Sequence, residues 1–98
     1  MLGTRLTDDI TLRGEALMDR IAATPIGHNP QALTVMLAEC TAIERSLESA
    51  SSIYKLRAAR HWIRLAYGNT LHSYPNDRLL RIALGALSDF LEQVRAET

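Results

Sequence analysis

The sequence predicts an all-α protein, a small antiparallel arrangement of four helices in a single domain over residues 1–98. Apolar residues recur at helical spacing in four segments, about 7–23, 30–47, 53–67 and 75–96. Short stretches rich in proline, glycine, asparagine or serine separate these segments, and nowhere do apolar and polar residues alternate as in a strand. Connections this short favour antiparallel neighbours.

The first predicted helix covers residues 7–23. Thr7 suits the N-cap, and the acidic pair Asp8 and Asp9 then falls in the first turn, where the helix dipole favours carboxylates. The apolar stripe of this helix consists of Leu6, Ile10, Leu17 and Ile21. Gly14 interrupts the stripe and costs about 1 kcal/mol of helix propensity relative to alanine. A close crossing with another helix would require this glycine. The alternative, which explains it equally well, is that the helix tolerates a glycine here without needing one.

The second predicted helix, residues 30–47, begins at favourable residues. Asn29 is a good N-cap, and Pro30 is accepted at the first helical position. The apolar stripe consists of Leu33, Met36, Leu37, Cys40, Ile43 and Leu47. From Ala32 to Ile43, nine of twelve residues are apolar. Such a helix is typically central in a bundle or part of an interface between protein copies.

Serines in the segment Glu48–Ser52 predict a break before the third helix, because serine favours caps and turns. One long helix over residues 30–67 is the alternative. The third helix, residues 53–67, has an apolar face formed by Ile53, Leu56, Ala59, Ile63 and Ala66. Another face carries Arg57, Arg60, His61 and Arg64. Gly68 and Asn69 provide a stop signal.

Pro75 marks the start of the fourth helix, which continues to about residue 96. Its broad apolar face consists of Leu79, Leu80, Ala83, Leu84, Leu87, Phe90, Leu91 and Val94. The apolar arcs of the second and fourth helices exceed what one small bundle needs, with Val35 and Met36 in one and Leu79 and Ile82 in the other. We therefore expect a homodimer, with complete burial inside one bundle as the alternative.

The composition argues against several classes of function, namely nucleic-acid binding, zinc binding and membrane insertion. Eleven basic and eleven acidic residues give zero formal net charge, whereas nucleic-acid-binding proteins usually carry a basic excess. One cysteine and three scattered histidines do not form the grouped ligand set of a structural zinc site. No apolar run approaches the roughly 18–20 residues of a membrane span, and the early acidic pair argues against a secretory signal. We expect a cytoplasmic protein with no metal, cofactor or membrane association.

Catalytic chemistry has little support in this sequence. Cys40 lies in the most apolar stretch, where a cysteine acts as a small buried hydrophobe, whereas a nucleophile needs exposure and a neighbouring base. No phosphate-binding loop, serine-hydrolase elbow or zinc-protease motif occurs. We expect that the protein is not an enzyme, and an enzyme centred on Cys40 is kept as a minor hypothesis.

The candidate binding residues lie on the third helix and in the loop after it. They are Arg57, Arg60, Trp62, Arg64, Tyr67, His72 and Tyr74. Aromatic residues and arginine are the types enriched at binding hot spots, and the alternative is that Trp62 and Tyr67 cover the end of the core. The cations allow three interpretations: salt bridges to Glu44 and Glu48, a protein-binding surface, or contact with nucleic acid.

These features predict a small regulatory protein that binds another protein through helix faces and occludes it. In size, helicity and neutral charge the chain resembles the bacterial anti-activators that sequester transcription factors, and it also resembles secretion chaperones. The resemblance rests on build and on no motif, and it implies a transcription regulator as the partner. A helical nucleic-acid-binding module using the Arg57–Arg64 face is the alternative, and a secretion or assembly chaperone is the second alternative.

Overall fold

The computed structural model describes the backbone of residues 2–23, 30–68 and 77–97, and the side chains of residues 8–23, 31–67 and 77–97. These ranges form four helices: α1 (Leu2–Ala23), α2 (Pro30–Arg45), α3 (Ala50–Gly68) and α4 (Asp77–Ala96). The described ranges contain no strand. The predicted all-α class with four helices is therefore confirmed.

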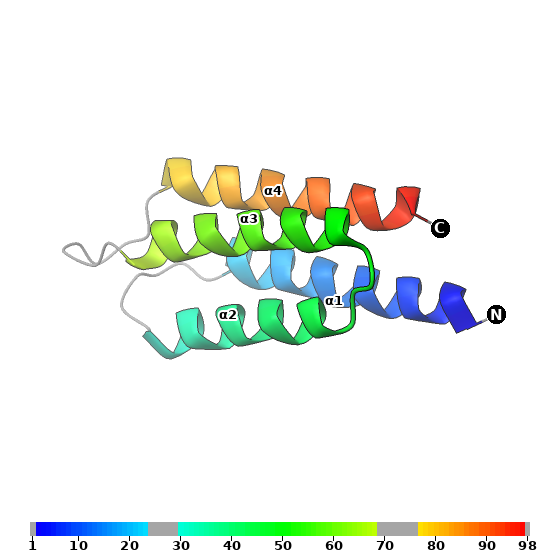
Figure 1. The fold of residues 1–98 in the computed structure, drawn as a ribbon. Coiled ribbons are helices and arrows are strands. Elements are labelled where there is room, and N and C mark those ends of the chain that lie inside the picture. The colour runs from blue at the N-terminus through cyan, green and yellow to red at the C-terminus, as the bar shows by residue number, and fades with distance from the viewer. Residues whose placement is uncertain (1, 24–29, 69–76, 98) are drawn as a thin grey trace.

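The helices lie side by side, and the chain direction reverses from each helix to the next (Figure 1). Around the bundle each helix packs against two neighbours, in the order α1–α2–α3–α4 and back to α1. Among the described residues, α3 packs most extensively against α4, whereas α1 and α2 form the sparsest pair. The two ends of the chain lie at the same end of the bundle (Figure 1).

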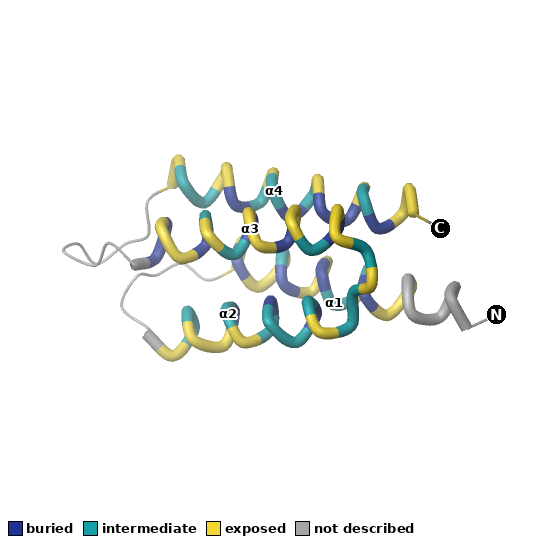
Figure 2. Tube along the Cα trace, in the orientation of Figure 1, coloured by how far each residue is buried: buried dark blue, intermediate teal, exposed yellow. Residues whose placement is uncertain are grey.

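The core is built from one apolar stripe of each helix. Its buried residues are Ile10, Leu17, Ile21, Met36, Cys40, Ile43, Leu56, Ala59, Ile63, Ala66, Tyr67, Ala83, Leu87, Phe90, Leu91 and Val94. Figure 2 shows the buried positions on the inward sides of the helices, as the helical spacing predicts. Met36 is fully buried, but Val35 and Ile82 remain 45% and 38% exposed. Part of the apolar excess of α2 and α4 therefore lies outside the core.

Gly14 marks a close approach between α1 and α4. A Cβ atom at this position would lie 2.6 Å from Cδ2 of Leu91, which is too short for a real contact. Leu91 is itself buried, so it has little freedom to move away. The close crossing, one of the two explanations for this glycine, is the one that the structure supports.

Two predicted helix starts are wrong. α1 begins at Leu2 rather than at Thr7, so Thr7 lies inside the helix and is not its N-cap. No proline precedes Thr7, and a helix continues toward the N-terminus until its hydrogen-bond ladder is interrupted. α3 also begins earlier than predicted, at Ala50. The predicted starting residues Asn29 and Pro75 lie outside the residues that the structure describes.

The break between α2 and α3 is confirmed, and it is shorter than predicted. α2 ends at Arg45, and the next two N–H groups bond to carbonyl groups three residues earlier, which closes the helix with a tight turn. α3 then begins at Ala50 rather than at Ile53, because the Ile53 N–H donates to the carbonyl oxygen of Ser49 at 3.1 Å. One continuous helix over residues 30–67 is excluded.

Glu97 fastens the C-terminal end of α4 to the N-terminal end of α3. The hydroxyl groups of Ser49 and Ser52 donate to Oε1 and Oε2 of Glu97, each at 2.6 Å, and Gln93 Nε2 donates to Oε1 at 2.9 Å. Ser52 is the buried polar residue among the described part of the chain, and Glu97 provides its acceptor. The hydrogen bonds from Ser49, Ser52 and Gln93 lower the pKa of Glu97 from its ordinary value of 4.5.

This junction makes the stability of the fold depend on pH through Glu97. Because its pKa is lower in the folded than in the unfolded chain, the carboxylate stabilises the fold above pH 4.5, and this contribution is lost as the pH falls through the folded value. We expect Glu97→Gln to lower the melting temperature at about pH 7, and we expect the gap to wild type to be smaller at about pH 3. Thermal unfolding followed by circular dichroism measures this gap.

The matched control is Glu48→Gln, which removes an exposed carboxylate from the connection between α2 and α3. The melting temperature of this variant should change between the two pH values by as much as that of the wild type. An equal loss of stability for Glu97→Gln at both pH values would contradict the role given to the carboxylate.

Candidate partner-binding face

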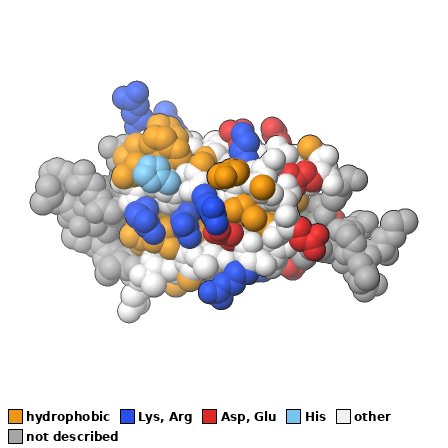
Figure 3. Space-filling model, viewed as in Figure 1, with side chains coloured by type: hydrophobic (Ala, Val, Ile, Leu, Met, Phe, Trp, Pro, Cys, Tyr) orange, Lys and Arg blue, Asp and Glu red, His pale blue; other side chains and the backbone are white. Residues whose placement is uncertain are grey.

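α3 presents to solvent a face that mixes ring side chains, a leucine and cations. Its members are Tyr54, Arg57, His61, Trp62, Arg64 and Leu65, which we call the α3 face. All except Trp62 are exposed, and Tyr54 and Leu65 are 70% and 40% exposed. In Figure 3 the histidine of the described part of the chain borders hydrophobic side chains on one side and basic side chains on the other.

Two arginines of α3 are held by a carboxylate of α2. Arg57 Nε donates to Oε1 of Glu44 at 2.8 Å, and Arg57 Nη2 forms an ion pair with the same oxygen at 2.7 Å. Arg60 Nη1 lies 3.8 Å from Oε2 of Glu44. The Glu44 side chain is only 18% exposed, so these cations balance a largely buried carboxylate. The predicted ion pairing between α2 and α3 is confirmed for Glu44, whereas Glu48 is exposed in the connection.

The remaining polar side chains of the α3 face are His61, which contacts Trp62, and Arg64. The ring of His61 meets the ring of Trp62 edge-on, with centroids 5.7 Å apart and an interplanar angle of 66°. Arg64 is exposed and forms no ion pair with any residue that the structure describes. The α3 face therefore combines a half-buried indole, an exposed leucine and a guanidinium group that forms no ion pair with a described residue.

A shallow groove of about 410 Å³ runs beside the α3 face, between α3 and α4. It is lined by Lys55, Ala58, Trp62, Ile82, Gly85, Ala86 and Asp89. Trp62 belongs to both the groove and the α3 face. The small side chains at Ala58, Gly85 and Ala86 keep the groove open, so a partner that covers Trp62 could also fill it.

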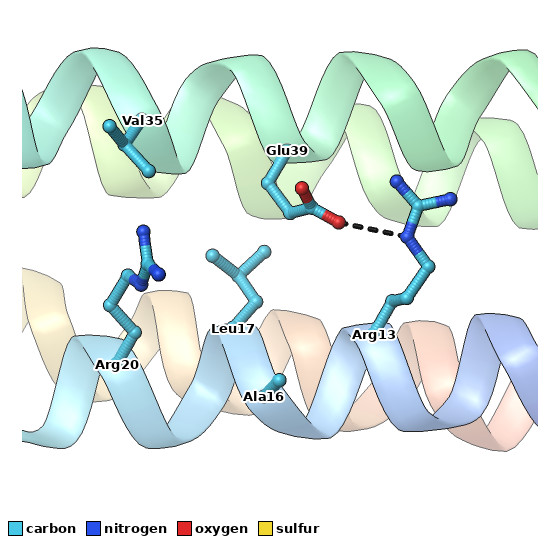
Figure 4. Close-up of a pocket in the computed structure, with 6 residues that line it drawn as sticks. All are labelled: Arg13, Ala16, Leu17, Arg20, Val35 and Glu39. Atoms are coloured by element: carbon cyan, nitrogen blue, oxygen red, sulfur yellow. Dashed lines mark hydrogen bonds and ion pairs between the residues drawn. The ribbon is translucent and has the colours of Figure 1, made fainter.

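A second hollow, of about 230 Å³, lies between α1 and α2, where the helices pack most sparsely (Figure 4). Glu39 of α2 accepts a hydrogen bond from Arg13 Nε of α1 at 2.9 Å, which closes one end (Figure 4). Arg20 and Val35 flank the other end, and Leu17 lies between the two ends (Figure 4). The Arg13–Glu39 ion pair joins the two helices across this hollow.

The other predicted binding residues are placed differently. Tyr67 is 4% exposed and packs in the core, so it does not belong to the α3 face. Its hydroxyl group is buried and has no hydrogen-bond partner among the residues that the structure describes, and burial raises the pKa of Tyr67. His72 and Tyr74 lie outside the described residues. Tyr54 and Leu65 were missed from the sequence, although their spacing from His61 places them on its side of the helix.

No protein-family model, curated protein or solved structure matches this sequence. Within the described residues, no three side chains of the His, Cys, Asp or Glu type are grouped to hold a metal ion. None of the described helices combines the length and apolar character needed to cross a membrane.

Tyr67→Phe tests whether the buried hydroxyl group lacks a partner in solution. Removing a buried polar group that forms no hydrogen bond relieves its desolvation cost, so we expect the free energy of unfolding to rise by about 1 kcal/mol. Urea denaturation measures this change. A decrease of similar size would show that the hydroxyl group is hydrogen-bonded in solution.

Cys40 should be inert in the folded protein. Burial is the main reason why its pKa rises from 9.0 to about 11, with Arg60 acting in the opposite direction and Glu39 acting with burial. A thiol reagent at about pH 8 should label Cys40 only after denaturation, because the folded protein keeps the thiol protonated and the reagent cannot reach the buried sulfur. An Ala22→Cys variant, with an exposed position on α1, provides the positive control. Rapid native labelling of Cys40 would support the enzyme hypothesis instead.

Proposed function

We propose that this chain is a small cytoplasmic regulatory protein that binds another protein through the α3 face and occludes a surface that its partner needs. The position of Trp62, the single tryptophan of the chain, carries the proposal. This side chain is half-buried at the surface next to exposed Leu65, rather than enclosed in the core. Tryptophan, tyrosine and arginine are the residue types that dominate binding hot spots.

The residue types of the α3 face indicate which side chains a partner would place against it. An apolar side chain of the partner would cover Trp62 and Leu65, and a carboxylate at the rim would meet Arg64. The hot spot lies on a helix that is packed on both sides, so little conformational entropy is lost on binding. Occlusion requires only such a rigid surface, and it needs no catalytic group.

The pairing of cations with Glu44 favours a protein partner over nucleic acid. Arg57 and Arg60 are already engaged by this carboxylate. Of the three arginines in the Arg57–Arg64 face, only Arg64 remains without an ion pair to a described residue, and the net charge of the chain is zero. Phosphate binding depends on several available cations acting together. By resemblance of build, we propose a bacterial transcription regulator as the partner, and a homodimer as the active form.

The test is capture of partners from lysate of the source cells, with nuclease present, followed by affinity measurement on the protein retained. We expect Leu65→Glu to weaken binding at least about tenfold, because it places a charge at the centre of an apolar contact. Leu12→Glu is the matched control, since Leu12 is 66% exposed on α1 and lies far from the α3 face in sequence and fold. It should bind as wild type does.

Arg64→Glu provides a second test of the same surface. It should weaken the complex and change its salt dependence, since the guanidinium group is expected at the rim. Loss of all binding after nuclease treatment, together with salt-sensitive binding to duplex DNA, would replace the proposal by the nucleic-acid alternative. Equal effects of Leu65→Glu and Leu12→Glu would exclude the α3 face.

A further inference from the structure

The outward side of α4 carries two cations before a central glycine and two carboxylates after it. Its exposed members are Arg78, Arg81, Gly85, Asp89 and Glu92, which we call the α4 stripe. Steps of three and four residues place them along one side of the helix. Both cations precede Gly85, both carboxylates follow it, and the two halves lie at equal distances from it in the sequence.

The stability of α4 does not explain this order. None of the four charged residues forms an ion pair with a residue that the structure describes. Arg81 and Asp89 are separated by roughly 12 Å along the helix, which prevents a direct contact between them. The helix dipole favours carboxylates near the N-terminus and cations near the C-terminus, and the α4 stripe has the opposite arrangement.

Gly85 is also unexplained within one copy of the chain. At Gly14 the side chain of Leu91 occupies the space that a Cβ atom would need. At Gly85 no described atom outside the adjacent helix backbone lies within 4 Å of such a Cβ, so no described neighbour excludes a larger residue. A glycine inside a helix weakens that helix, and its benefit is the close approach of another backbone.

We propose that a second copy of this chain docks on the α4 stripe, with the two α4 helices antiparallel and crossing at Gly85. In this arrangement Arg81 faces the partner subunit's Asp89, and Arg78 faces the partner subunit's Glu92. A two-fold axis repeats each pair, so the stripe is complementary to itself. The two glycines at the crossing allow the helix backbones to approach closely.

The charge distribution beyond the stripe supports the same orientation. On the side of the molecule shown in Figure 3, most basic side chains lie toward one end of the bundle and most acidic ones toward the other. Antiparallel copies bring opposite ends together, which also guides their encounter. Ile82, exposed beside Gly85, adds apolar contact. Gly85 and Asp89 also line the groove beside Trp62, so the second copy would cover that groove. The rest of the α3 face lies on the neighbouring helix and remains open. The inference therefore rests on the proposed homodimer and not on the proposed partner.

Charge reversal tests the pairing directly. Arg81→Glu and Asp89→Arg, each alone, place like charges opposite one another twice per dimer, so each should raise the dimer dissociation constant at least about tenfold. The double variant restores opposite charges and should return the constant to within about threefold of wild type. An equimolar mixture of the two single variants should also dimerise, because every facing pair again joins an acid and a base. Sedimentation equilibrium measures all four samples.

Gly85→Gln tests the crossing point. Glutamine suits a helix better than glycine does, so the fold should become more stable while the dimer is lost. Ala22→Gln, at an exposed position of α1, is the matched control and should leave the dimer intact. A wild-type chain that is monomeric up to about 1 mM would overturn the proposal. A dimer insensitive to both charge reversals would also overturn it, while leaving self-association and the α3-face partner untouched.

Discussion

The apolar seam between α3 and α4 determines the placement of both surfaces that concern function. It is the most extensive helix pairing among the described residues, and Glu97 locks its end by accepting hydrogen bonds from Ser49 and Ser52. Ser52 is buried, so its hydroxyl group needs that acceptor. With α3 and α4 fixed against each other, the α3 face and the α4 stripe become rigid, adjacent surfaces that different partners can occupy.

Some charged side chains of this protein form ion pairs between helices, and others are exposed without such a pair among the described residues. Glu44 holds two arginines of α3, Arg13 of α1 binds Glu39 of α2, and Arg95 of α4 binds Glu15 of α1 at 3.2 Å. These contacts join neighbouring helices, although exposed ion pairs contribute little stability individually. A neutral total charge therefore conceals an uneven distribution, in which Arg64 and the α4 stripe remain available for binding.

Much of the fold could be predicted from sequence because helical periodicity directly encodes which side of each helix is buried. The core stripes and the burial of Cys40 follow from that pattern. The break between α2 and α3 is instead indicated by serines, and α2 ends at Arg45, two residues before the predicted end. The start of α1 could not be placed, because Thr7 is a suitable cap but nothing before it forces the helix to stop. Whether Trp62 or Tyr67 is exposed depends on how α3 is rotated against its neighbours, which only the tertiary structure determines. The charges of the α4 stripe are visible in the sequence, but their lack of internal partners is not.

The sparse contact between α1 and α2 has a consequence for motion within the folded state. Local opening requires least free energy where few apolar contacts must be broken. Separating α1 from α2 disturbs the hollow of Figure 4 and the Arg13–Glu39 pair, whereas separating α3 from α4 disrupts the main seam of the core. Amide hydrogens should therefore exchange with solvent earliest along the α1–α2 side, while the α3–α4 hairpin exchanges only when the whole chain unfolds.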